Sequence, residues 1–472
     1  MRAPHAAAHD RGHRNSHRWL ALIGALGVLF TLVAGQLVRL AVIGPSGPRL
    51  AITEPLTRTF ARPDIVDRHG RLLATDLEAP SLFADPTLIQ DPDEAAEQLA
   101  AIFSELDQAE LRRALADRTR RFVWIRRGLA PAVAQRVHDL GLIGLAFRKE
   151  PRRAYPQGTL AGHVLGAVNV DNRGTSGIER WIDDSVGVEA ILAVRPDARP
   201  PVRLSLDLGV QHGLEQELAA AVARYRAAGA AGLVMDIASG EMVAAASLPD
   251  IDPARPAESL DAARIDKLSA GVYELGSIFK TVTVALALDS GKATVEKIYD
   301  VRAPLRIGPY TIRDLHPQAR PLTVREIFVH SSNVGAGLLA LEAGGAAQIA
   351  FLQKLGLLEA MRTEAGPVAA PKLPKRWGQT ETITISYGHG LAVAPIQFAA
   401  AAAALLNGGR KVSPTFRAGA ERALSAGEPV VTAETSTALA GLMRRNVTHP
   451  AGTGRRADVP GSEVGGKTGT AE

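Results

Sequence analysis

The stretch Gly276-Ser277-Ile278-Phe279-Lys280 decides how this sequence is interpreted, because it sets a serine and a lysine three residues apart. On a helix, positions three apart share one face, so the two side chains meet. A serine hydroxyl needs a neighbouring base to become a nucleophile, and a lysine serves when burial and nearby positive charge lower its pKa. The almost wholly apolar run over 279–288 predicts that Ser277 opens a buried helix, with Gly291 just after its end.

Two later sequence motifs supply further polar groups that an active site built on a serine–lysine pair needs. Ser331-Ser332-Asn333 adds a hydroxyl and an amide, and Lys467-Thr468-Gly469-Thr470 adds a second lysine, two hydroxyls and a glycine that admits close backbone approach. Each string alone is commonplace, since S-x-x-K often starts an ordinary helix and S-x-N usually forms a turn or a cap. All three together, in this order, indicate one active site.

Length and composition limit the class of protein, the number of domains and the chemistry that is possible. The chain has 472 residues, 46% hydrophobic and 22% charged, which is typical of globular domains. At about 150 residues each, this length suits roughly three domains. The sequence contains no cysteine, which excludes disulfides and thiolate chemistry. The twelve histidines show no H-E-x-x-H spacing, so we expect neither a metal nor another cofactor.

The formal net charge is +5, and the densest basic cluster surrounds Phe122-Val123-Trp124-Ile125. Such a cluster can bind an acidic partner. We favour the alternative, a solvated strand face with Trp124 packed inward. The arginines of the cluster are Arg118, Arg120, Arg121, Arg126 and Arg127.

The N-terminus has the pattern of a membrane anchor. Residues 1–18 carry four arginines against one acid, residues 19–35 carry no charge, and the apolar stretch continues around Arg39 to Ile43. This length suits a bilayer span of about 17–25 residues and exceeds the 7–15-residue core of a signal peptide. The basic tail predicts an N-terminus inside the cell and a body outside. The alternative is a signal cleaved after the V-A-G string at 33–35.

Local patterns predict several elements of the soluble part. We expect helices over 93–115, over 130–140, from Leu208 onward and over 395–406. Strands over 232–236 and 241–246, joined at Ser239-Gly240, read as a hairpin. Helices beside a hairpin indicate α+β layering.

With these motifs in view, the sequence resembles a class B penicillin-binding protein, an inner-membrane peptidoglycan D,D-transpeptidase. Residues 62–70 resemble the family's R-G-x-I-x-D-R-N-G string, from which Pro63 and His69 depart. The strings at 153–166 and 177–179 resemble the other two motifs of its non-catalytic pedestal. Residues 61–74 and 273–277 look closer to septal, cell-division members than to elongation-type members.

The resemblance implies an α+β fold: a penicillin-binding-protein/β-lactamase-like transpeptidase domain, with an antiparallel sheet and helices, after a transmembrane helix and a pedestal. We expect a cytoplasmic tail over 1–18, an anchor over 19–43, a pedestal (dimerisation-type) domain over 46–200 and a transpeptidase domain over 201–472. Family members continue with further C-terminal strands, whereas this sequence stops two residues after Thr470. We therefore expect those strands to be missing, Lys467 to lack support, and the chain alone to be a poor catalyst.

The resemblance also implies the chemistry. Ser277 attacks the penultimate D-Ala of a stem peptide, Lys280 takes its proton, and Ser331 relays a proton to the leaving amine. Asn333 holds the substrate backbone and orients Lys280. The backbone N–H groups of Ser277 and Thr470 form the oxyanion hole.

The K-T-G string has the role of a carboxylate site in the family. By resemblance, Lys467, Thr468, Gly469 and Thr470 bind the substrate, and the lysine and threonines receive its terminal carboxylate. β-Lactams acylate Ser277 because their ring mimics the D-Ala-D-Ala end.

The implied partners are stem peptides, β-lactams, the inner membrane and other divisome or glycan-polymerising membrane proteins, with no nucleic acid. Three alternatives remain: a β-lactam sensor of the same fold, a non-catalytic division scaffold, and an elongation-type transpeptidase. The pedestal motifs argue against the sensor.

Overall fold

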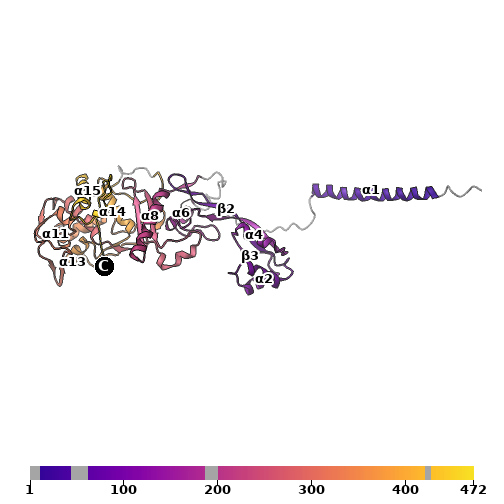
Figure 1. Ribbon diagram of the computed structural model, residues 1–472, viewed down its shortest axis with the longest axis horizontal. Coiled ribbons are helices and arrows are strands. Elements are labelled where there is room, and N and C mark those ends of the chain that lie inside the picture. The colour runs from indigo at the N-terminus through magenta and orange to yellow at the C-terminus, as the bar shows by residue number, and fades with distance from the viewer. Residues whose placement is uncertain (1–10, 44–61, 187–199, 420–426, 472) are drawn as a thin grey trace, which may run out of the picture. The chain divides into compact units, whose positions relative to one another are not determined.

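The computed structural model describes residues 11–43, 62–186, 200–419 and 427–471 (Figure 1). The chain divides into two compact units, Met1–Arg58 and Thr59–Glu472.

The first unit contains one long helix, α1 (Arg11–Ile43). Its stretch Leu20–Leu37 has a mean hydropathy of 2.1, and none of it is buried, so the helix is long and apolar enough to cross a membrane. The helix begins before the predicted anchor and so includes the basic end of the predicted tail. Residues 1–10 of that tail lie outside the described residues.

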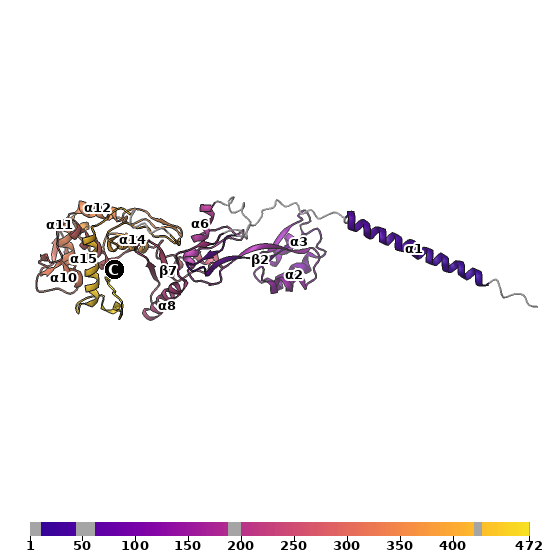
Figure 2. The ribbon, with the colours of Figure 1, turned by 90° about the horizontal axis from the view of Figure 1, so that it is seen from above.

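The pedestal is built on one long strand, β2 (Leu72–Ala84). Antiparallel β4 (Leu145–Ala154) pairs with it from Thr75↔Ala154 to Ala84↔Leu145. The short β3 (Val123–Arg126) pairs with the far end of β2, and β1 (Ile65–Val66) connects β2 to β5 (Val202–Arg203). Figure 2 shows α2 and α3 beside β2, where they cover a separate apolar core.

The predicted single helix over 93–115 is wrong, because two helices occupy this stretch, α2 (Pro92–Ile102) and α3 (Gln108–Ala116). Asp107 causes the break, since its backbone is extended and its carboxylate accepts the N–H of Glu110 as an N-cap. The next helix, α4 (Pro131–His138), matches the prediction and has proline in its first turn.

The three pedestal strings meet in one buried ionic centre. Glu179, on α6 (Gly177–Val186), is fully buried and accepts from Arg62 Nε at 2.8 Å and Arg153 Nε at 2.6 Å. Asp183 Oδ1 lies 2.6 Å from Arg62, and Asp76 Oδ1 lies 3.1 Å from Arg153. The short helix α5 (Gly162–Leu165) packs against α6. These residues come from segments far apart in sequence, so the ionic centre holds the three pedestal motifs against one another.

The region after the pedestal begins with α8 (Leu208–Tyr225), which packs on a hairpin of β6 (Ala230–Met235) and β7 (Met242–Leu248). The predicted hairpin is confirmed. Within the described residues, this hairpin is all that is present of the expected antiparallel sheet. Residues 463–471, which include the K-T-G string, have no regular secondary structure.

Helices are the main regular secondary structure in the rest of this region, and in Figure 1 α11, α13, α14 and α15 gather into one group. Its central helix, α9 (Lys280–Asp289), is buried from Lys280 through Ala287, as predicted. Gly291 follows its end with φ +68°. The helices that contact α9 are α10 (Val324–Val329), α11 (Asn333–Ala343), α12 (Gly345–Lys354), α13 (Gln379–Ser386), α14 (Pro395–Leu406) and α15 (Ala433–Thr448).

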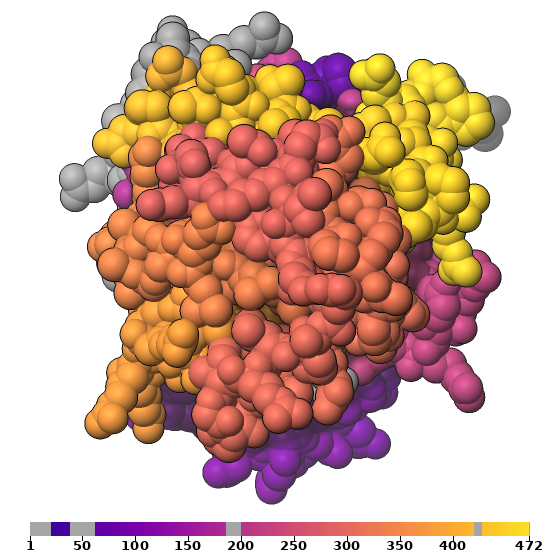
Figure 3. Space-filling model, turned by 90° about the vertical axis from the view of Figure 1, so that its left-hand side faces the viewer, coloured from indigo at the N-terminus to yellow at the C-terminus, as the bar shows by residue number. Residues whose placement is uncertain are grey.

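Short strand pairs and turns complete this region. The pairs are β8 (Tyr273–Glu274) with β15 (Ala392–Val393), β9 (Ile298–Tyr299) with β12 (Leu322–Thr323), β10 (Leu305–Ile307) with β11 (Tyr310–Ile312), and β13 (Arg362–Thr363) with β14 (Gly366–Pro367). Helix α15 packs against α10, and Figure 3 shows the yellow C-terminal residues beside the orange ones on one face. Because α15 packs against α10 and α9, the K-T-G string that follows α15 in sequence lies near the helices of residues 280–329.

Candidate active site

The S-x-x-K string forms a 3₁₀ turn, η4 (Gly276–Phe279), that leads directly into α9. The turn and the helix place the two side chains on one face, with Lys280 Nζ 3.0 Å from Ser277 Oγ. Lys280 is 1% exposed and Ser277 is half-buried. A buried amine therefore lies against a hydroxyl that remains accessible.

The S-S-N string surrounds the same lysine with acceptors. Lys280 Nζ lies 2.6 Å from the Ser331 carbonyl, 3.1 Å from Ser331 Oγ and 2.7 Å from Asn333 Oδ1. Ser331 has φ +56°, a left-handed conformation that is uncommon outside glycine and typical of functional sites. Ser332 then caps α11, accepting the N–H of Gly335.

The K-T-G string completes the group, because Lys467 Nζ lies 3.0 Å from Ser331 Oγ. The residues before it are held by α15. Asn446 Nδ2 donates to the Gly466 carbonyl at 2.9 Å, and the Gly466 N–H donates to the Met443 carbonyl at 3.1 Å. We expected further strands to supply this support, and the structure shows that α15 supplies part of it.

Close backbone approaches seat the K-T-G segment against the Ser277 turn. Gly276 has φ +55°, and a Cβ there would lie 2.1 Å from the Thr470 carbonyl oxygen. A Cβ on Gly469 would lie 2.8 Å from the Leu275 carbonyl oxygen. Thr468 and Thr470 are exposed. The segment therefore presents hydroxyls to solvent beside the serine.

The electrostatics suit a lysine base. Burial lowers the pKa of Lys280 to about 7, the positive charge of Lys467 lowers it as well, and Asp314 acts in the opposite direction. Burial also lowers the pKa of Lys467, to about 8. Near neutral pH, Lys280 therefore has a substantial neutral fraction while most of Lys467 stays charged.

Sequence reasoning missed two residues near this group. Asp314 binds the S-S-N loop, and nothing in its local sequence marks it. Glu274 accepts the N–H of Gly390 at 2.9 Å and lies 3.1 Å from His389 Nδ1. His389 thus contacts a carboxylate of strand β8.

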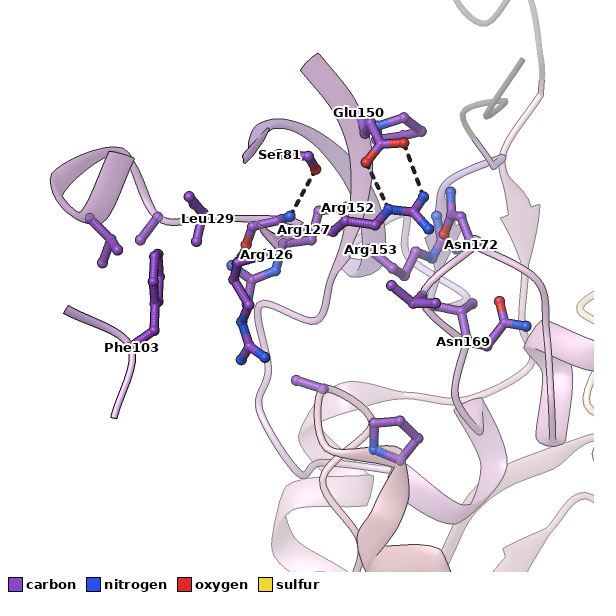
Figure 4. Close-up of a pocket in the computed structure, with 18 of the residues that line it drawn as sticks. Ser81, Phe103, Arg126, Arg127, Leu129, Glu150, Arg152, Arg153, Asn169 and Asn172 are labelled. Atoms are coloured by element: carbon purple, nitrogen blue, oxygen red, sulfur yellow. Dashed lines mark hydrogen bonds and ion pairs between the residues drawn. The ribbon is translucent and has the colours of Figure 1, made fainter. Parts of the chain in front are cut away.

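A pocket of about 550 Å³ lies elsewhere, lined mostly by pedestal residues and also by Pro253, Ala254 and Pro256 after β7 (Figure 4). Arg127 lines it and pairs with Glu150 at 2.9 Å, and its guanidinium stands 5.1 Å from the Trp124 ring. Trp124 is half-buried and stacks edge-on against Phe122 at 4.8 Å. The basic cluster is therefore partly neutralised by carboxylates. The predicted inward packing of Trp124 is wrong, because Val123 and Ile125 face the apolar core and Trp124 lies on the opposite face of the strand.

Comparison with known proteins identifies the family. The family model described as "Penicillin binding protein transpeptidase domain" matches residues 230–472, and "Penicillin-binding Protein dimerisation domain" matches residues 58–185. The chain therefore belongs to the penicillin-binding protein family. A dimerisation domain before a transpeptidase domain is the class B arrangement, and the relatives below support the septal type.

Three curated relatives show the extent of the likeness. The chain is 38% identical over 413 residues to the probable peptidoglycan D,D-transpeptidase FtsI of Caulobacter vibrioides, which covers 87% of this chain and 69% of that protein. It is 33% identical over 446 residues to the probable peptidoglycan D,D-transpeptidase PenA of Neisseria meningitidis serogroup A, covering 90% and 75%. It is 28% identical over 495 residues to the peptidoglycan D,D-transpeptidase FtsI of Escherichia coli K12, covering 97% and 82%.

Proposed function

We propose that this protein is a membrane-anchored peptidoglycan D,D-transpeptidase that cross-links stem peptides through an acyl-enzyme on Ser277, in septal wall synthesis, and that β-lactams target it. One observation carries the proposal: the buried Lys280 amine, with its pKa lowered to about 7, lies 3.0 Å from the Ser277 hydroxyl. A base with a pKa near the working pH is what general-base activation of a serine needs.

Acylation follows from this geometry. Lys280 takes the proton from Ser277 Oγ as the oxygen attacks the carbonyl of the penultimate D-Ala. The oxyanion is stabilised by the backbone N–H groups of Ser277 and Thr470, and removing one such donor typically costs about 10²–10³ in rate. Ser331, which contacts both lysines, passes a proton to the departing D-Ala amine.

Substrate binding uses the groups around this pair. The Lys467 ammonium and the hydroxyls of Thr468 and Thr470 receive the terminal carboxylate, with Gly469 allowing close approach. Asn333 holds the substrate backbone through its amide and orients Lys280. An amino group of a neighbouring stem peptide then attacks the acyl-enzyme, forming the cross-link and regenerating the Ser277 hydroxyl.

The proposed function also assigns a role to each part of the chain. A cytoplasmic tail over 1–18 and an anchor over 19–43 place the body outside the inner membrane, since four arginines precede the span. The pedestal over 46–200 supports the transpeptidase domain over 201–472. Other divisome or glycan-polymerising membrane proteins are its protein partners.

The decisive experiment measures turnover of a stem pentapeptide that ends in D-Ala-D-Ala. We expect release of D-Ala and formation of a cross-linked dimer, both detected by mass spectrometry, and neither with Ser277→Ala. A sensor would react with penicillin but release no D-Ala, and a scaffold would do neither. Either result would refute the proposed function.

A further inference from the structure

Asp314 follows β11 and places its carboxylate at the start of α11. Its Oδ2 accepts from Ser332 Oγ at 2.6 Å, and its Oδ1 accepts from the backbone N–H groups of Asn333 and Val334, the latter at 3.0 Å. The first N–H groups of a helix lack partners within the helix and favour negative charge. One carboxylate thus fixes the whole first turn of α11.

The residue before it acts on the side chain of the same asparagine. The Arg313 carbonyl accepts from Asn333 Nδ2 at 3.2 Å. Because the amide nitrogen points to Arg313, the amide oxygen is left to point at Lys280 Nζ, 2.7 Å away. The pair Arg313–Asp314 therefore clamps Asn333 at both its backbone and its side chain.

Ser331 also depends on this clamp. Its left-handed conformation, φ +56°, is sparsely populated by serine and persists only where neighbouring contacts impose it. Both of its contacts with Lys280, through the carbonyl and through Oγ, are made in this conformation. The bond from Ser332 Oγ to Asp314 anchors the next residue and so holds Ser331 in place.

We propose that Asp314 is a positioning residue for acylation, whose carboxylate holds Ser331 and Asn333 against Lys280 and sets a fixed negative charge near the base. The inference rests on the proposed function of Ser277 and Lys280. Asp314 acts through the loop that it binds, and its charge acts on the lysine through space.

The charge has a consequence of definite sign. The charged groups that face Lys280 are Lys467, which lowers its pKa, and Asp314, which raises it. An uncharged residue at position 314 therefore lowers the pKa of Lys280 and increases the neutral, basic fraction at acidic pH. The acid limb of the acylation profile moves to lower pH.

The test compares Asp314→Asn, Asp314→Ala and a matched control, Asp300→Asn, in the full chain. Asp300 is an exposed carboxylate paired with Arg302. The measurement is the rate constant of penicillin acylation between about pH 5 and pH 9, with urea unfolding to verify folding.

Asp314→Asn keeps the shape of the side chain and one acceptor oxygen but loses the charge, so it should shift the acid limb of the acylation profile to lower pH. Asp314→Ala loses both the charge and the anchor, so it should show the same shift of the acid limb and should acylate about 10–100-fold more slowly at its optimum pH. Asp300→Asn should match the wild type.

An unshifted acid limb in Asp314→Asn would overturn the electrostatic role, and a wild-type rate in folded Asp314→Ala would overturn the anchoring role. If Asp314→Ala does not fold, the pH profile of Asp314→Asn alone decides. Ser277→Ala, run in parallel, separates this inference from the proposed function, because labelling of that variant would refute the nucleophile whatever Asp314 does.

Discussion

Lys280 and Lys467 share one acceptor, since their Nζ atoms lie 3.1 and 3.0 Å from Ser331 Oγ. Two ammonium groups so close repel each other, which helps to keep Lys280 neutral. The shared hydroxyl gives Ser331 contact with the base on one side and with the carboxylate-binding lysine on the other. The two lysines therefore have opposite protonation requirements within one hydrogen-bonded group.

This arrangement predicts a bell-shaped pH dependence of penicillin acylation. The rate should rise through about pH 7 as Lys280 loses its proton, and fall through about pH 8 as Lys467 loses its charge. Lys467→Arg keeps its charge, because arginine stays protonated in proteins, and should remove the basic limb. A basic limb that persists in Lys467→Arg would contradict the assignment.

Gly276→Ala should slow penicillin acylation at least about tenfold, because the added Cβ would lie 2.1 Å from the Thr470 carbonyl and displace the K-T-G segment. Gly291→Ala is the matched control. Gly291 also has a left-handed φ, +68°, but its Cβ would meet open space. Equal acylation rates for the two variants would show that the approach of Thr470 to Gly276 is dispensable.

Glu179→Ala should lower the free energy of unfolding by about 3–5 kcal/mol, because it removes the buried carboxylate that the guanidinium groups of Arg62 and Arg153 share. Urea unfolding followed by tryptophan fluorescence measures this. Glu78→Ala, which breaks the exposed Glu78–Lys149 pair, should leave the midpoint unchanged. Equal midpoints for the two variants would exclude a structural role for the ionic centre.

The N-terminal helix predicts a single-pass topology with its N-terminus inside. A reporter enzyme that is active only outside the cytoplasm, fused after Pro45, should be active and should sediment with membranes. Recovery of a soluble protein that begins near Gln36 would show cleavage and exclude a permanent anchor.

Local signals were predictable from the sequence. The bounds of α14 (Pro395–Leu406) match the prediction, because proline marks its first turn and Gly408-Gly409 follows its end. Short-range patterns also predicted the hairpin of β6 and β7. The contact between Ser277 and Lys280 was predicted in the same way, from their spacing of three residues. The break at Asp107 was missed because the apolar periodicity continues across it.

Tertiary partners were not predictable in this way. Asp314 reaches the S-S-N loop across 18 residues of sequence, and it resembles any loop aspartate until the chain is folded. The support of Gly466 by Asn446 and Met443 depends likewise on how α15 packs. Such contacts are determined by the fold around them rather than by a local pattern.

The most direct test of the central claim is the mass of the intact protein after reaction with penicillin, followed by peptide mapping. The account predicts one covalent adduct per chain, located on Ser277, with severely slowed formation in Lys280→Ala because the serine loses its base. It predicts no adduct in Ser277→Ala. An adduct that persists in the Ser277→Ala protein would place the nucleophile elsewhere and contradict the account.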